Sequence, residues 1–167
     1  SGAPSAGSTS PFWTLLISPA YLLGLPYRPW TLFLGWLSLT ATAWGAQRLT
    51  GRLFPARPAL PLLAGLLCAL EWHLVWAAVS GMETLLFCAL ALALLVESVG
   101  LPVLSWRRAL LLGLLAGALI LTRPEGALLV GLIGLDPWLR LAQARRRPDR
   151  ATWLHSLGLA AGGLLLV

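Results

Sequence analysis

The sequence predicts an all-α protein, a polytopic bundle of transmembrane helices with about five full spans and a truncated one. Of its 167 residues, 58% are hydrophobic and only 11% are charged, and the mean hydropathy of +0.81 lies far above the range of soluble domains. Nine tryptophans and seventeen glycines suit the same class, because indole rings favour the level of the lipid headgroups and glycine is common in membrane helices. Apolar runs near the length of roughly 20 residues that crosses a hydrocarbon core recur between charged or proline-containing segments.

An N-terminal apolar stretch, residues 12–25, is too short to cross a bilayer and contains Pro19. We expect it to form a short juxtamembrane helix on the outer face, either re-entrant or lying on the membrane surface. The predicted spans follow at residues 30–49, 58–79, 84–104, 109–122, 126–139 and, incompletely, 153–167. The chain is expected to be one transmembrane domain over 1–167, with an outer-face loop and juxtamembrane segment at 1–29 and helices over 30–167. Both ends resemble the interior of a longer sequence, so we expect a fragment of a larger membrane protein.

The arginines predict the orientation of these spans. All twelve basic residues are arginines, and ten of them fall in three clusters between apolar runs: Arg48, Arg52 and Arg57; Arg107 and Arg108; and Arg140, Arg145, Arg146, Arg147 and Arg150. Short cytoplasmic loops retain basic residues, so we place all three clusters inside, which leaves Arg28 and Arg123 on the opposite face. We expect a multi-pass protein of the cell inner (plasma) membrane. Because the net charge of +6 is divided among such loops, it does not indicate nucleic acid as a partner.

The segment "TRPEGA" places Arg123 and Glu125 between two leucine-rich runs. As a helix, the run before it rises only about 21 Å, so both charges are expected below the outer interface, where each costs on the order of 3 kcal/mol. Pro124 suits the first position of the next helix, with Glu125 in its first turn. A helix N-terminus beside a guanidinium is a ready site for phosphate. The alternatives are a simple Arg123–Glu125 pair, or an Arg123 that reaches the headgroups.

The segment "SGMET" has a similar design at another helix start. Gly81 permits a tight turn, Ser80 is a candidate cap, and Glu83 is expected in the first helical turn. Compensation of the helix dipole alone would explain Glu83. Two such carboxylates and one arginine on the same membrane face nevertheless predict a site that holds a phosphate and orients hydroxyl groups.

Other polar residues have weaker interpretations. Glu71 and His73 lie within an apolar run, where an ionisable residue is a functional candidate; the alternative is a helix break or a polar contact. Four residues are expected near the cytoplasmic face, solvated or paired with arginines: Glu97, Asp136, Asp149 and His155. Cys68 and Cys88 are interpreted as small hydrophobic residues. The sequence contains no metal-ligand spacing, phosphate-binding glycine loop or nucleophile elbow, so no metal site is predicted and the catalytic group is unidentified.

The motifs "SGMETLLFCALAL" and "LTRPEGALL", about forty residues apart, resemble those of bacterial membrane glycosyltransferases of the GT-C superfamily. The greatest similarity is to polyprenyl-phosphate-dependent arabinofuranosyl- and mannosyltransferases. The N-terminal "GAPSAGSTSPFWTLL" also resembles the stretch that follows the first large outer loop of that family. The resemblance extends from the N-terminus to about residue 139.

The resemblance implies transfer of a sugar from a polyprenyl-phosphate donor to an extracytoplasmic acceptor, a cell-envelope glycan, lipid or protein. Arg123 would bind the donor phosphate, while Glu83 and Glu125 would position sugar hydroxyls or order Arg123, with Ser80 and Gly81 in the same substrate site. The family's general base, an aspartate of the first outer loop, would lie upstream of Ser1, so this chain alone is expected to be inactive. No cofactor is certain, and a divalent cation remains open. The alternatives are a transporter or flippase of a lipid-linked anionic substrate, or a scaffold.

Overall fold

The computed structural model describes residues 10–99, 106–143, 153–154 and 157–161, and in this part of the chain every regular element is a helix. The predicted all-α class is therefore confirmed. Seven helices are delimited: α1 (Pro11–Leu22), α2 (Tyr27–Leu53), α3 (Ala59–Leu70), α4 (Trp72–Ser80), α5 (Thr84–Ser98), α6 (Trp106–Thr122) and α7 (Gly126–Gln143).

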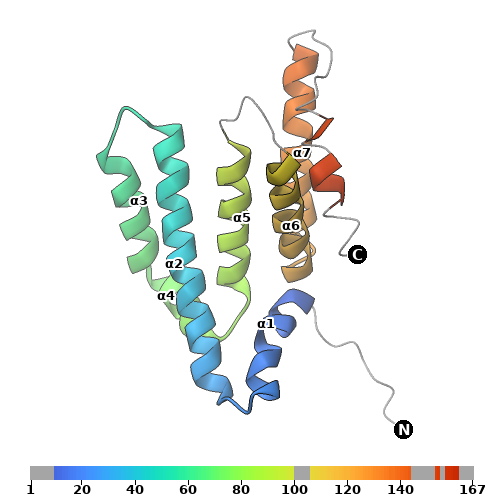
Figure 1. Cartoon of the computed structure of the whole chain (residues 1–167). Coiled ribbons are helices and arrows are strands. Elements are labelled where there is room, and N and C mark those ends of the chain that lie inside the picture. The colour runs from blue at the N-terminus through green and yellow to red at the C-terminus, as the bar shows by residue number, and fades with distance from the viewer. Residues whose placement is uncertain (1–9, 100–105, 144–152, 155–156, 162–167) are drawn as a thin grey trace.

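The helices run up and down through one bundle, with α4 following α3 toward the lower end (Figure 1). The longest helix, α2, packs against α3, α4 and α5, and α5 in turn packs against α6 and α7. The α1–α2, α4–α5 and α6–α7 turns all lie toward the lower end in Figure 1. Helix α1 lies below the lower end of α6 and contacts both α2 and α6. The short predicted helix near the N-terminus is thus present, and it covers the end of the bundle that carries the "TRPEGA" turn.

Several predicted boundaries agree with the helices. Residues 30–49 lie inside α2, 109–122 inside α6 and 126–139 inside α7, while α5 begins at Thr84 and ends at Ser98. The last residues of the predicted span 84–104 and most of 153–167 lie outside the described residues.

The predicted span 58–79 is not one straight helix, and the break falls at "EWH", where the sequence analysis had a helix break as an alternative. The structure divides this run into α3 and α4, which meet at a bend of 51°. The cause is Glu71, whose extended backbone (ψ 123°) ends α3 and whose carboxylate accepts the N–H of Leu74 at 2.8 Å as the N-cap of α4. Within the described residues, no one helix has both the length and the apolar character to cross a membrane, whereas the bent α3–α4 pair meets both requirements together.

Two apolar clusters hold the bundle together. One lies between α5, α6 and α7 and includes the fully buried Leu94, Leu112 and Leu119; the other joins α2, α4 and α5 around Leu85 and Ala78. The outer surfaces of the helices remain strongly apolar, with these large side chains exposed among others: Leu63, Leu67, Trp76, Leu114, Leu128 and Leu132. Large exposed apolar patches are typical of surfaces that contact a membrane or another protein.

Candidate functional site

The structure brings Arg123 and Glu83 together, although about forty residues separate them in the chain. Arg123 Nε lies 3.6 Å from Glu83 Oε1, and the two side chains are 39% and 19% exposed, respectively. The contact joins the α4–α5 turn to the α6–α7 turn. Because the Arg123 side chain is more than a third exposed, part of it remains accessible beside the ion pair.

The α4–α5 turn is shaped by Gly81, which ends α4 in the left-handed conformation (φ 75°) that glycine adopts most readily. Glu83 is the N-cap residue of α5 rather than a member of its first turn, and its side chain accepts no capping hydrogen bond. Its carboxylate is thereby left for Arg123. Ser80 was expected to cap α5, but it does not. Its hydroxyl donates to the carbonyl of Ala77 at 2.8 Å, within α4.

The α6–α7 turn begins immediately after the fully buried Thr122. The N–H of Arg123 still donates to the carbonyl of Leu119 at 3.0 Å, and the N–H of Gly126 donates to the carbonyl of Arg123 at 2.9 Å. We expected Pro124 and Glu125 in the first turn of α7. Instead, both residues form the turn that precedes the helix. Glu125 is exposed. In the described part of the chain, Arg123 forms its ion pair with Glu83 and not with Glu125.

Helix α1 contributes features that the sequence analysis missed. Ser10, its N-cap residue, is buried, and its hydroxyl has no hydrogen-bond partner among the described residues. A hollow of about 280 Å³ lies between α1 and the start of α2, lined by Thr14, Ile17, Ser18, Tyr21 and Tyr27. The spacing of Thr14, Ser18 and Tyr21, four and then three residues, places hydroxyl groups on one helical face, and this signal was present in the sequence.

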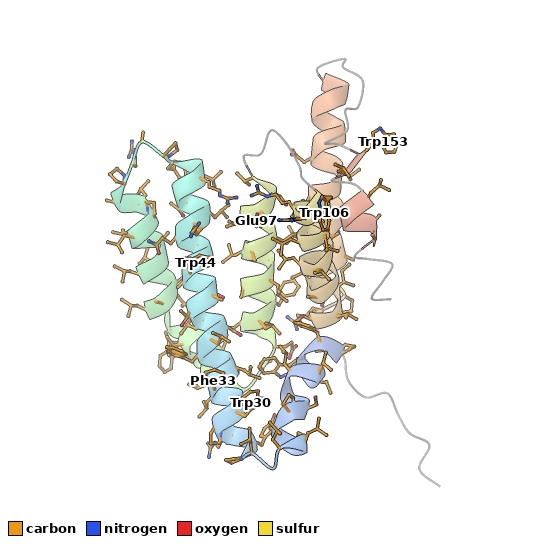
Figure 2. The ribbon with its side chains drawn as sticks, in the orientation of Figure 1. Trp30, Phe33, Trp44, Glu97, Trp106 and Trp153 are labelled. Atoms are coloured by element: carbon orange, nitrogen blue, oxygen red, sulfur yellow. The ribbon has the colours of Figure 1, made fainter. Side chains whose placement is uncertain are left out.

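Glu97 lies at the opposite end of the bundle, between α5 and α6 (Figure 2). Arg108 donates to its Oε2 from Nε at 3.0 Å and from a terminal nitrogen at 2.8 Å, and Arg52 lies 3.8 Å from its Oε1. The expected pairing of Glu97 with nearby arginines is confirmed. Asp136 is exposed on α7, whereas Asp149 and His155 lie outside the described residues.

Glu71 and His73 form a local contact rather than a site inside the bundle. The two side chains are exposed, and Glu71 Oε1 lies 2.7 Å from His73 Nδ1. Since Glu71 also caps α4, the interpretation of "EWH" as a helix break is confirmed. Cys68 and Cys88 are free, half-buried thiols.

Within the described ranges, no group of three or more histidine, cysteine, aspartate or glutamate side chains is arranged to bind a metal ion. Comparisons with protein families, curated proteins and solved structures gave no match to this chain. Interpretation of the Arg123–Glu83 pair therefore depends on its chemistry.

Proposed function

We propose that this chain serves a membrane glycosyltransferase reaction, in which a sugar passes from a polyprenyl-phosphate donor to a glycan, lipid or protein acceptor outside the cytoplasm. The protein would be a multi-pass component of the inner membrane, with the "SGMET" and "TRPEGA" turns on the outer side. The observation that carries this proposal is the Arg123–Glu83 contact of 3.6 Å, formed by two turns at the same end of the bundle.

Arg123 is suited to bind the phosphate group of the polyprenyl-phosphate donor. Departure of a polyprenyl phosphate builds negative charge on the phosphate oxygens, and a fixed cation beside them stabilises that charge in the transition state. A guanidinium has five N–H donors, so contact of Nε with Glu83 leaves terminal nitrogens for a second anion. Glu83 is a positioning residue in this scheme, because the charge of its carboxylate holds the Arg123 guanidinium beside the α4–α5 turn.

Glu125 would accept hydrogen bonds from sugar hydroxyls. Its carboxylate is exposed in the same turn as Arg123. A sugar attached to a phosphate at Arg123 would therefore lie close to the Glu125 carboxylate. The hydroxyl groups of Thr14 and Ser18, in the hollow beside α1, are further groups of this kind at the same end of the bundle.

A transporter or flippase of a lipid-linked anion is the second candidate. The break of 51° between α3 and α4 favours it, because many transporters form their substrate sites from interrupted helices. Their half-helix N-termini commonly bind the substrate's anionic group. In this chain the Glu71 carboxylate already occupies the N-terminus of α4, which argues against an anion site at this break.

The test measures sugar transfer in proteoliposomes that contain the complete protein and a labelled polyprenyl-phosphate sugar. Arg123→Ala should lower the transfer rate by about 10²- to 10³-fold, the usual loss when one group that stabilises transition-state charge is removed. Arg28→Ala is the matched control, since Arg28 is exposed at the same end of the bundle and should leave the rate unchanged. Protease protection and melting temperature verify insertion and folding.

The role of Glu83 is tested in the same assay. If Glu83 acts only through Arg123, the Glu83→Gln/Arg123→Ala double variant should be no slower than Arg123→Ala. Wild-type transfer rates in Arg123→Ala would refute the proposal. Movement of the lipid-linked sugar across the bilayer without transfer would favour the flippase.

A further inference from the structure

The end of the bundle opposite the Arg123–Glu83 pair carries a concentrated positive charge. Five arginines lie in α2, in the turn after it and in the first turn of α6: Arg48, Arg52, Arg57, Arg107 and Arg108. Glu97 is the carboxylate that pairs with this group in the described residues, and Arg52 and Arg108 both engage it. The side chain of Glu97 is only 25% exposed, so it offers little repulsion to an approaching anion.

Two of the remaining arginines are stacked on exposed indole rings. The guanidinium carbon of Arg48 lies 4.6 Å from the ring centroid of Trp44, and that of Arg107 lies 5.6 Å from the ring centroid of Trp106. Trp44 is 58% exposed and Trp106 is 66% exposed. Figure 2 shows Trp44, Glu97 and Trp106 in the upper half of the bundle, on α2, α5 and α6. Indole rings favour the headgroup level of a bilayer, so in a membrane each stack would hold a cation near the phospholipid phosphates.

We propose that this arginine–tryptophan surface, formed by Arg48, Arg57, Arg107, Trp44 and Trp106, binds the headgroups of anionic phospholipids. Arg48, Arg57 and Arg107 are exposed and form no ion pair with any described residue, so their donors are available to lipid phosphates. The ion pairs of Glu97 with Arg52 and Arg108 join α2, α5 and α6 at this end of the bundle. The proposal requires the bundle to lie in a membrane but does not require sugar transfer.

The test measures lipid retention by the complete protein in detergent, using native mass spectrometry with phosphatidylglycerol or phosphatidylcholine of identical acyl chains. The wild type should retain phosphatidylglycerol preferentially. The Arg48→Gln/Arg57→Gln/Arg107→Gln variant should lose on the order of a hundredfold of that preference, since each basic residue near an anionic surface contributes roughly a fivefold gain in affinity. Arg28→Gln, an exposed arginine at the other end of the bundle, is the control and should retain the preference.

Equal retention of the two lipids by the wild type would overturn the proposal. So would an undiminished preference in the triple variant, or an equal loss in Arg28→Gln. Melting temperatures of the variants confirm that each is folded. Because the sugar-transfer assay depends on Arg123 and this assay on Arg48, Arg57 and Arg107, failure of one proposal is distinguishable from failure of the other.

Discussion

The close approach of α2 and α4 at Gly35 gives the sharpest test of the packing. A Cβ atom built on Gly35 would lie 1.9 Å from the carbonyl oxygen of Ala78 and 2.9 Å from its carbonyl carbon. Both atoms belong to the backbone of α4, so no side-chain rotation relieves the clash. Gly35→Ala therefore requires the two helices to separate.

The size of the effect follows from these distances. Carbon–oxygen contacts settle at about 3.3 Å or more, so the helices must move apart by roughly 1.4 Å, and a gap of 0.5–1 Å already removes about a quarter to a half of each dispersion contact. The cluster around the fully buried Leu85 would be opened. Overpacking typically lowers the free energy of unfolding by about 1–3 kcal/mol and occasionally by more. The higher helix propensity of alanine than of glycine offsets about 1 kcal/mol of this loss. Because this clash is with rigid backbone, we expect a cost above the typical range, about 4 kcal/mol, and, after the gain of about 1 kcal/mol, a net loss near 3 kcal/mol.

The assay is thermal unfolding in detergent micelles, followed by circular dichroism and tryptophan fluorescence at a fixed scan rate. A loss near 3 kcal/mol should lower the apparent melting temperature on the order of 10 °C. The matched control is Gly131→Ala in α7, where an added Cβ meets nothing within 4 Å, so the melting temperature should stay constant or rise. Equal melting temperatures for the two variants would show that α2 and α4 do not approach as the structure has them.

Two further substitutions test the polar contacts in the same unfolding assay. Glu97→Gln removes the charge that Arg52 and Arg108 share and should destabilise the bundle by about 1–3 kcal/mol; an unchanged melting temperature would contradict this structural role. Glu71→Ala removes the N-cap of α4 and should cost about 1 kcal/mol, whereas Glu71→Asp, which retains a capping carboxylate, should lose less. The explanation of the α3–α4 break fails if Glu71→Ala and Glu71→Asp behave alike.

Helix ends that depend on local chemistry could be predicted from the sequence. The start of α5 at Thr84, the end of α6 at Thr122 and the start of α7 at Gly126 all lie beside glycine, proline or charged residues that interrupt apolar runs. For the run 58–79, length alone predicted a single span, and the sequence left open whether "EWH" is a helix break or a polar contact; the structure shows the break at Glu71. The Glu71 carboxylate satisfies a backbone N–H and redirects the chain.

The candidate site could be predicted only in part. Alternation of the spans placed the "SGMET" and "TRPEGA" turns at one end, but the partner of Arg123 depends on how α5 packs against α6. Glu125 is two residues away in sequence, yet the ion pair forms with Glu83. Ser10 and the hydroxyl face of α1 were missed because a short apolar helix was interpreted for its length and not for its polar periodicity.

The two ion-pair clusters of the bundle differ in a way that bears on function. Arg108 makes two hydrogen bonds of 2.8 and 3.0 Å to Glu97 and is 27% exposed, as expected of a contact whose purpose is to join helices. Arg123 lies 3.6 Å from Glu83, beyond a good hydrogen bond, and is 39% exposed. A partly exposed ion pair without hydrogen bonds contributes little to stability. The looser geometry at Arg123 leaves its terminal nitrogens without an ion pair to Glu83, as the proposed phosphate site requires.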